Sequence, residues 1–186
     1  MRGIAFRYLP NAITLVRIAL IPVFAGFVLA GDRALALSTI ALIGFSDWLD
    51  GWLARRFGLQ TPSGAFLDAL ADKLAQVTAL ALLALSAGTH FTRIPRWFFA
   101  LVLAREVLLV YGAVRVRGNR RRVSIRARWE GKLSTLCVFL IVFASLLGAD
   151  PSLVLVGALL AAPVVVAAAV RYTMEGHRQL KEGGSP

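Results

Sequence analysis

Cysteine, histidine and acidic side chains are scarce in this sequence. The 186 residues include one cysteine, Cys137, and two histidines, His90 and His177. A lone cysteine excludes an internal disulfide, and neither histidine has a metal-ligating neighbour in the sequence. Aspartate and glutamate together number 10, against 21 lysines and arginines. We therefore expect neither a disulfide scaffold nor a cysteine-histidine metal centre, and each acidic residue inside an apolar segment requires a reason.

Apolar runs dominate the chain. Hydrophobic residues make up 58% of it and the mean hydropathy is +0.72, too apolar for a soluble core of this size. Uncharged runs of about bilayer-spanning length are residues 74–92, 133–149 and 151–170. Three further apolar runs are residues 9–30, 34–53 and 95–116. They reach this length only if charged residues are allowed inside them: Arg17, Asp47, Asp50, Arg105 and Glu106. We therefore expect an all-α, polytopic membrane protein with six transmembrane helices, folded as a single domain over residues 1–186.

Basic residues give these six spans an orientation. When the spans alternate across the membrane, three basic residues at or beyond the ends of the spans lie on one side: Arg33, Arg93 and Arg96. Fifteen lie on the other side: Arg2, Arg7, Arg55, Arg56, Arg115, Arg117, Arg120, Arg121, Arg122, Arg126, Arg128, Lys132, Arg171, Arg178 and Lys181. The positive-inside rule assigns the second side, with both termini, to the cytoplasm. Because the first apolar run contains Arg17, we expect it to remain as a helix rather than to be a cleaved signal peptide.

Four aspartates share one layer near the cytoplasmic side. Asp47 and Asp50 lie three residues apart in one predicted helix, and Asp68 and Asp72 lie four apart in the next, so each pair shares a helix face. The intervening segment "RFGLQTPSG" contains proline and glycine, which end one helix and allow a turn into the next. We expect the two helices to be adjacent and antiparallel, with the carboxylate pairs converging across their interface.

Four carboxylates this close repel one another and require a cation. A site with only oxygen ligands favours a hard divalent ion such as Mg²⁺, and four carboxylates can hold two. The alternative is that the aspartates form interhelical ion pairs with Arg55, Arg56, Lys73 or Arg105. Gly51 favours the metal site, because a glycine in mid-helix is costly unless a ligand or a backbone approaches closely.

The same residues form a complete motif: Asp47, Asp50-Gly51, Ala54-Arg55, Gly64, Asp68 and Asp72, with gaps of two, two, eight, three and three residues. This pattern resembles the full signature of the CDP-alcohol phosphotransferase (CDP-alcohol phosphatidyltransferase) family. The segments "LPNAITLVRIALIP", "AREV" and "GKLST" are similar to the phosphatidylglycerophosphate synthase and cardiolipin synthase branch of that family. The likeness covers roughly residues 10–136.

The resemblance implies a six-helix, commonly dimeric enzyme that uses CDP-diacylglycerol as donor. It implies that two divalent ions, Mg²⁺ or Mn²⁺, are held by Asp47, Asp50, Asp68 and Asp72, and that Asp72 also acts as general base. The donor-binding residues that it implies are Asn11, Gly51, Ala54, Arg55, Thr61 and Gly64. The reaction would transfer the phosphatidyl group to an alcohol and release CMP.

The acceptor alcohol remains open between two candidates. Basic residues on or near the fourth and fifth spans suggest an acceptor that carries phosphate, such as glycerol 3-phosphate; they are Arg105, Arg115, Arg117 and Lys132. Ala113 stands where phosphatidylglycerophosphate synthases often have arginine, which favours a cardiolipin synthase with phosphatidylglycerol as acceptor. Glu106 favours the first candidate, because similar cardiolipin synthases frequently have aspartate there.

The basic segment from about residue 115 to 132 is typical of an electrostatic anchor to anionic lipid, with a direct role in gathering an anionic substrate as the alternative. We expect no nucleic-acid partner, because the inner membrane surface explains the charge. A divalent-cation channel or carrier is a further alternative, but the ionisable groups stop in the inner half of the membrane. The expected location is the bacterial cytoplasmic membrane, with the site facing the cytoplasm.

Overall fold

The computed structural model describes residues 9–57, 62–86, 90–118 and 129–182, and all regular structure within them is helical. This confirms the all-α prediction for the described residues. The α-helices are α2 (Leu9–Ala30), α3 (Arg33–Phe57), α4 (Pro62–Ala81), α5 (Arg96–Gly118), α6 (Trp129–Leu147) and α7 (Pro151–Glu182). A π-helical turn, η1 (Leu82–Ser86), continues α4.

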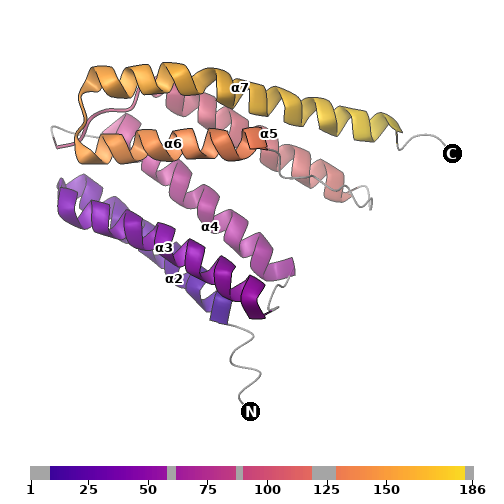
Figure 1. Ribbon diagram of the computed structural model, residues 1–186, viewed down its shortest axis with the longest axis horizontal. Helices are drawn as coiled ribbons and strands as arrows, with labels where there is room; N and C mark the ends of the chain where they lie inside the picture. The colour runs from indigo at the N-terminus through magenta and orange to yellow at the C-terminus, as the bar shows by residue number, and fades with distance from the viewer. Residues whose placement is uncertain (1–8, 58–61, 87–89, 119–128, 183–186) are drawn as a thin grey trace, which may run out of the picture.

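The helices form an elongated bundle. Figure 1 shows α2 and α3 side by side at one edge and α6 and α7 at the other, with α4 running between them. The helix α4 packs on α2, and α5 packs on α7. The expected adjacency of α3 and α4 is present through their aspartate side chains, although the two backbones stay further apart: among the described residues they make few close backbone contacts, and α2 packs against both. The two aspartate pairs therefore meet beside α2, which is the helix that packs against both.

The exterior of the bundle is apolar. Many large hydrophobic side chains are exposed, including Leu29, Leu153 and Leu160, while a second apolar set fills the core around Phe24, Leu83 and Phe98. Three helical segments of the described chain are long and apolar enough to cross a membrane: Ala12–Ala30, Phe66–Ser86 and Pro151–Met174. A membrane protein explains apolar side chains on both the inside and the outside of the bundle.

Two glycines end helices at the same end of the bundle. Gly31 follows α2 with φ 76°, and Gly148 follows α6 with φ 74°. At the first turn Asp32 N–H donates to the Phe27 carbonyl at 3.0 Å, and at the second Ala149 N–H donates to the Ala144 carbonyl at 3.0 Å. These bonds satisfy carbonyls that the helix ends leave free, and only glycine adopts the required backbone without strain.

Aspartates begin the helices that follow these turns. The Asp32 carboxylate accepts the Leu35 N–H at 3.0 Å, and the Asp150 carboxylate accepts the Ser152 N–H at 2.8 Å. Both act as N-caps. The hydrogen bonds from the Ser152 hydroxyl and backbone N–H also lower the pKa of Asp150.

Arg33 joins three segments at this end of the bundle, which we call the closed end. Its guanidinium donates to the His90 carbonyl at 2.7 Å and to the Leu147 carbonyl at 3.2 Å. Nearby, the Thr92 hydroxyl donates to the Ala149 carbonyl and the Thr92 N–H donates to the Ser145 carbonyl. The start of α3, the segment before α5 and the end of α6 are thus tied together by backbone carbonyls rather than by acidic partners.

We predict that Gly148→Ala destabilises the protein by about 1–3 kcal/mol, since a non-glycine residue at positive φ is strained. An added Cβ would also lie 2.5 Å from Nη2 of Arg33, so the contact of Arg33 with α6 would be disturbed. The matched control is Gly157→Ala within α7, where the nearest atom to an added Cβ is Ile141 Cγ1 at 3.6 Å. Thermal melting in detergent measures both variants, and an equal melting temperature for the two would contradict the role of Gly148.

Candidate functional site

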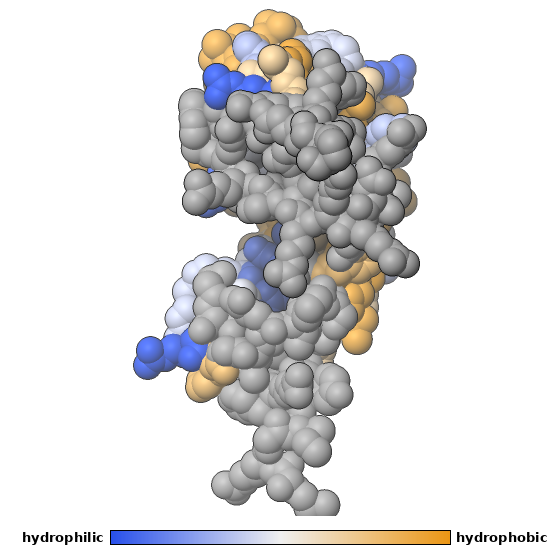
Figure 2. Space-filling view, turned by 90° about the vertical axis from the view of Figure 1, so that its right-hand side faces the viewer, coloured by the Kyte–Doolittle hydropathy of each residue, from blue (hydrophilic) through white to orange (hydrophobic). Residues whose placement is uncertain are grey.

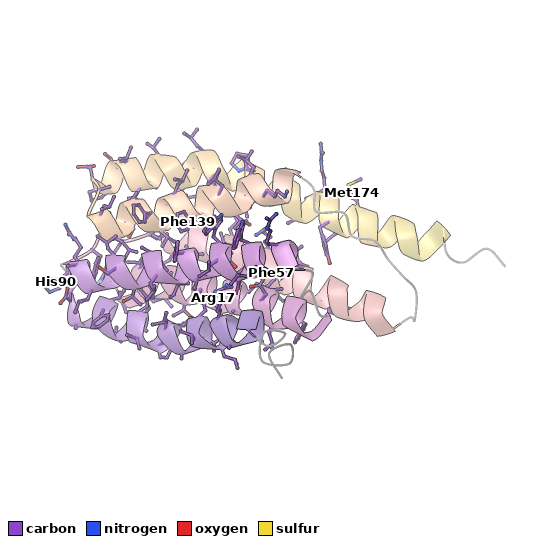
Figure 3. All side chains as sticks on the ribbon, turned by 60° about the horizontal axis from the view of Figure 1, so that its bottom comes forward. Arg17, Phe57, His90, Phe139 and Met174 are labelled. Carbon is purple, nitrogen blue, oxygen red and sulfur yellow. The ribbon has the colours of Figure 1, made fainter. Side chains whose placement is uncertain are left out.

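The centre of the site is a buried arginine that comes from the first described helix. Arg17 has a side-chain exposure of 0%, although it lies in an apolar run of α2. Figure 3 shows Arg17 inside the bundle, nearer to Phe57 at the end of α3 than to His90 at the closed end. The guanidinium therefore lies at the depth where α3 ends and α4 begins.

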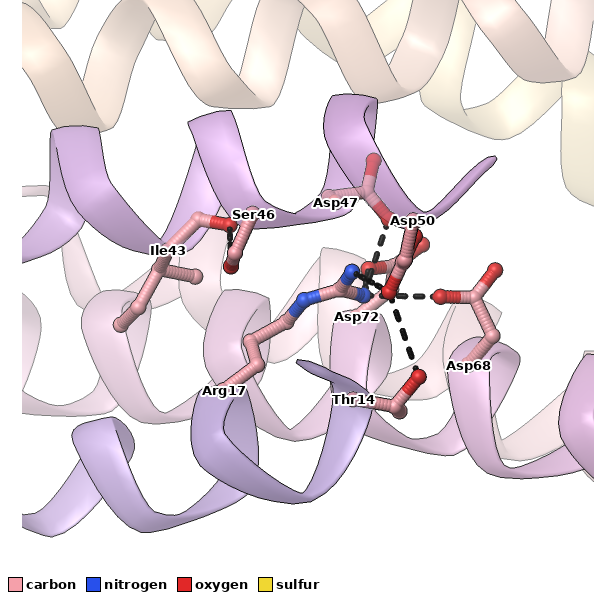
Figure 4. Close-up of polar contacts among 8 residues, drawn as sticks. All are labelled: Thr14, Arg17, Ile43, Ser46, Asp47, Asp50, Asp68 and Asp72. Carbon is pink, nitrogen blue, oxygen red and sulfur yellow. Dashed lines mark hydrogen bonds and ion pairs between the residues drawn. The ribbon is translucent and has the colours of Figure 1, made fainter. Parts of the chain in front are cut away.

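All four aspartates converge on this guanidinium (Figure 4). Arg17 Nη1 lies 2.9 Å from Asp47 Oδ1, 2.8 Å from Asp68 Oδ1 and 3.0 Å from Asp72 Oδ1. Arg17 Nη2 lies 2.5 Å from Asp50 Oδ2. The convergence predicted from the two pairs of spacings is present in the structure, and the element that joins them is α2.

The four carboxylates differ in their access to solvent. The side chain of Asp50 is 4% exposed, whereas that of Asp72 is 52% exposed, and Asp47 and Asp68 are intermediate. Asp50 also accepts a hydrogen bond from the Thr14 hydroxyl, which lies one turn before Arg17 on α2, at 3.2 Å. The site is therefore closed around Asp50 and open on the side of Asp72.

Part of the surface at this end of the bundle is also polar, as expected for the open side of the site. Figure 2 views the bundle from the end where α3 ends and α4 begins, and among the described residues it shows hydrophilic surface next to hydrophobic surface. We call this end the aspartate end. A polar ligand can approach the carboxylates from here, while the apolar flanks suit lipid chains.

Three of the aspartates form a candidate metal site. One carboxylate oxygen from each of Asp47, Asp50 and Asp68 lies within 4.8 Å of the other two. Oxygen atoms at this spacing suit a hard divalent cation, and the excess of negative charge over the single guanidinium favours one. Asp72 is not a member of this close group of three, although it shares Nη1 of Arg17 with Asp47 and Asp68.

A second charged cluster, from α4 and α5, involves the residue after Asp72 along the chain. Lys73 and Arg105 both form ion pairs with Glu106: the Lys73 ammonium contacts Oε2, and Arg105 Nη1 lies 2.5 Å from Oε1. Arg105 and Glu106 are buried. Lys73 and Arg105 therefore have Glu106 as their ionic partner, not the aspartates, and the alternative that named these two as aspartate partners is wrong. Among the described side chains, the cation that pairs with the aspartates is Arg17.

The structure says less about the other predicted residues. Gly51 and Gly64 are half-buried in α3 and α4, and Lys132 is exposed near the start of α6. Thr61 lies outside the described residues. The predicted residues whose helical backbone is described without their side chains are Asn11, Ala54, Arg55, Arg115 and Arg117.

Sequence reasoning missed Thr14, Arg17, Lys73 and Glu106 as parts of the polar layer. The signal for Arg17 was available, because a charge in mid-span normally faces a partner inside the bundle. Thr14 lies three residues earlier, on the same face of α2. From the sequence, Lys73 was considered only as a partner of the aspartates, and Glu106 only as a residue that distinguishes branches of the family. In the structure these two residues form an ion pair with each other.

Comparison with known proteins identifies the family of this chain. The family model for CDP-alcohol phosphatidyltransferase matches residues 7–173. The CDP-diacylglycerol–glycerol-3-phosphate 3-phosphatidyltransferase of Bacillus subtilis (strain 168) is 34% identical over 154 residues, which is 75% of this chain and 76% of that protein.

Proteins of the same name from other bacteria are also similar. The one from Pectobacterium atrosepticum is 34% identical over 74% of this chain and 76% of its own length, and the one from Pseudomonas fluorescens is 41% identical over 54% and 52%. The extent of the family match, and the identity to the relatives from Bacillus subtilis and Pectobacterium atrosepticum over about three quarters of each chain, confirm the family resemblance. The chain therefore belongs to the CDP-alcohol phosphatidyltransferase family of enzymes.

Proposed function

We propose that the protein transfers the phosphatidyl group of CDP-diacylglycerol to glycerol 3-phosphate and releases CMP. The observation that carries this proposal is the convergence of four carboxylates, from α3 and α4, on one point at the open aspartate end. The names of the relatives from Bacillus subtilis and Pectobacterium atrosepticum support the choice of donor and acceptor.

Asp47, Asp50 and Asp68, with Asp72, are the residues that would hold two divalent ions, Mg²⁺ or Mn²⁺. When bound, such ions supply positive charge that stabilises the negative charge developing on the diphosphate. The close group formed by Asp47, Asp50 and Asp68 supports the assignment, because its oxygen donors match the preference of hard cations.

Asp72 is the proposed general base. It is the most exposed of the four carboxylates, so an acceptor hydroxyl can reach it from the open side of the site. The hydroxyl proton passes to the Asp72 carboxylate while the acceptor oxygen forms a bond to the phosphorus that carries diacylglycerol. The bond from that phosphorus to the bridging oxygen breaks, and CMP leaves with the electron pair.

The donor would lie along the aspartate end. Gly51 and Ala54 would leave room for the cytidine, Arg55 would bind the diphosphate, and Gly64 would allow the connection between α3 and α4 to approach the donor. Asn11 and Thr61 would contribute further contacts. The apolar flanks of this end support the arrangement, since the diacylglycerol chains can then remain in the lipid.

The acceptor phosphate would be bound by basic residues of α5 and α6: Arg105, Arg115, Arg117 and Lys132. Arg105 has a buried Nε without a hydrogen-bond partner among the described residues, which supports a polar ligand nearby. Lys132 is exposed and free to approach an anion. The alternative acceptor is phosphatidylglycerol, as in a cardiolipin synthase, and the observation in its favour is Ala113 in place of arginine.

The membrane arrangement that we propose places one domain in the bacterial cytoplasmic membrane as six spans, with both termini and the aspartate end at the cytoplasm. The distribution of basic residues supports it. The basic segment at about 115–132 would bind anionic lipid, and the working unit would be a homodimer.

A cation channel is disfavoured, because apolar residues such as Phe24, Leu83 and Phe98 fill the bundle core.

An acceptor screen tests the proposed activity. We expect purified protein with CDP-diacylglycerol and Mg²⁺ or Mn²⁺ to release CMP when glycerol 3-phosphate is added. Phosphatidylglycerol, inositol phosphate and serine, each added alone, serve as comparisons. Release with phosphatidylglycerol alone would identify a cardiolipin synthase and overturn the proposed acceptor.

We predict that Asp72→Asn lowers kcat about 10²–10⁴-fold, the usual contribution of general acid-base catalysis, because an amide cannot accept the proton. Folding and metal binding should be largely retained, since Asp47, Asp50 and Asp68 remain. The assay is CMP release, with circular dichroism and Mn²⁺ binding measured on the same samples. Asp150→Asn is the matched control at the closed end, where asparagine caps a helix equally well. Unimpaired turnover of the Asp72 variant would remove this residue from the role of base.

We predict that Asp50→Asn weakens metal activation at least about tenfold, because it removes the most buried charge of the proposed metal site. The measurement is CMP release against Mn²⁺ concentration, compared with the same titration of the wild type. Activity that persists in excess chelator, in either protein, would contradict the two-metal mechanism.

A further inference from the structure

Arg17 occupies the position at which a divalent ion would meet the aspartates. Its Nη1 and Nη2 lie 2.5–2.9 Å from one oxygen each of Asp47, Asp50 and Asp68, the residues of the close carboxylate group. A Mg²⁺ ion bound by these oxygens would lie about 2.0–2.1 Å from each of them. The guanidinium and the ion therefore require the same small volume, and their positive charges repel each other.

The hydrogen bonding of Arg17 is incomplete for a purely structural residue. Its side chain is fully buried, yet Nε has no hydrogen-bond partner among the described residues. A buried guanidinium with an unsatisfied donor is costly, and it remains here because the surrounding carboxylates compensate. The arrangement is stable only while no stronger cation occupies the cluster.

We propose that Arg17 is a displaceable internal counter-ion, which neutralises the aspartates in the metal-free enzyme and withdraws when divalent ions bind. This inference rests on the proposed metal-dependent function and adds a residue that sets the metal affinity. Withdrawal of Arg17 breaks four ion pairs, so part of the binding free energy of the metal is used to displace the guanidinium. The wild type consequently binds metal less tightly than the carboxylates alone allow.

Arg17→Gln tests the inference through direct metal binding. Mn²⁺ affinity is measured in detergent by calorimetry or by electron paramagnetic resonance, with no substrate present. We expect the variant to bind Mn²⁺ at least about tenfold more tightly than the wild type, because no ion pairs must be broken. Melting in excess chelator should occur at a lower temperature than for the wild type, because the four carboxylates have lost their counter-ion.

Arg33→Gln is the matched control, since it removes the same charge from the closed end, where the arginine donates hydrogen bonds to the carbonyls of His90 and Leu147. Its Mn²⁺ affinity should equal that of the wild type. If Arg17→Gln does not fold, Arg17→Lys replaces it: the ammonium keeps the charge but lacks the two-nitrogen fork that bridges the carboxylates. We expect Arg17→Lys also to bind Mn²⁺ more tightly than the wild type.

The outcomes separate this inference from the proposed function. Unchanged or weaker Mn²⁺ binding in the Arg17 variants, with normal binding in the wild type, overturns the counter-ion role and leaves the metal site intact. Equal tightening in Arg33→Gln also overturns it, because net charge would then explain the effect. A wild type that binds no Mn²⁺ at all overturns the metal site of the proposed function, and the counter-ion role with it.

Discussion

The charge balance between Arg17 and four aspartates determines how the helices of the aspartate end are arranged. Each aspartate pair on α3 and α4 would repel the other pair, and the two helices make little direct contact. The helix α2 packs against both and brings one guanidinium to within 3.0 Å of all four carboxylates. Because a buried, unpaired charge is far more costly than a paired one, this cluster fixes the depth and rotation of α2 relative to its neighbours.

The two ends of the bundle use different chemistry. At the closed end, Arg33 and Thr92 bind backbone carbonyls, and glycines at positive φ allow the chain to turn within a few residues. These neutral contacts join α3, α6 and the segment before α5. At the aspartate end, charges face one another around a partly open site. A rigid closed end and an ionic open end suit an enzyme whose ligands enter from one side of a membrane.

The sequence predicts the helices well where hydropathy and turn chemistry agree. The run 9–30 coincides with α2, and the charge-admitting run 95–116 corresponds to α5. The bounds of the helices differ from those of the apolar runs where the chain favours a helix without being apolar. The helix α4 begins at Pro62, well before the uncharged run at residue 74, because proline suits the first helical turn and the residues that follow are rich in alanine and leucine, so the charged residues interrupt the apolar run but not the helix. For the same reason α7 continues to Glu182, beyond the apolar run.

The aspartate cluster could be predicted from spacing, since residues three and four apart must share a helix face. An arginine in mid-span also indicates that Arg17 needs a partner inside the bundle, but hydropathy and spacing do not say which helix packs against which. Arg105 illustrates the same limit. An arginine at this position suggests a residue that binds an anionic ligand. In the structure, however, Arg105 also forms an ion pair with its neighbour Glu106. The rotation of α5 that permits this contact depends on how the bundle packs.

The position of Arg17 also constrains how the protein is assembled. The helix α2 is the first described helix to be synthesised, and its arginine has no acidic partner within its own apolar run. An arginine at the centre of a lone transmembrane helix costs about 2.5–3.5 kcal/mol on insertion scales. Its partners follow some 30 to 55 residues later along the chain. The apolar residues of α2 can offset this cost on insertion, but the burial of Arg17 becomes favourable when α3 and α4 supply the carboxylates, so the packing of these three helices is coupled through one charge cluster.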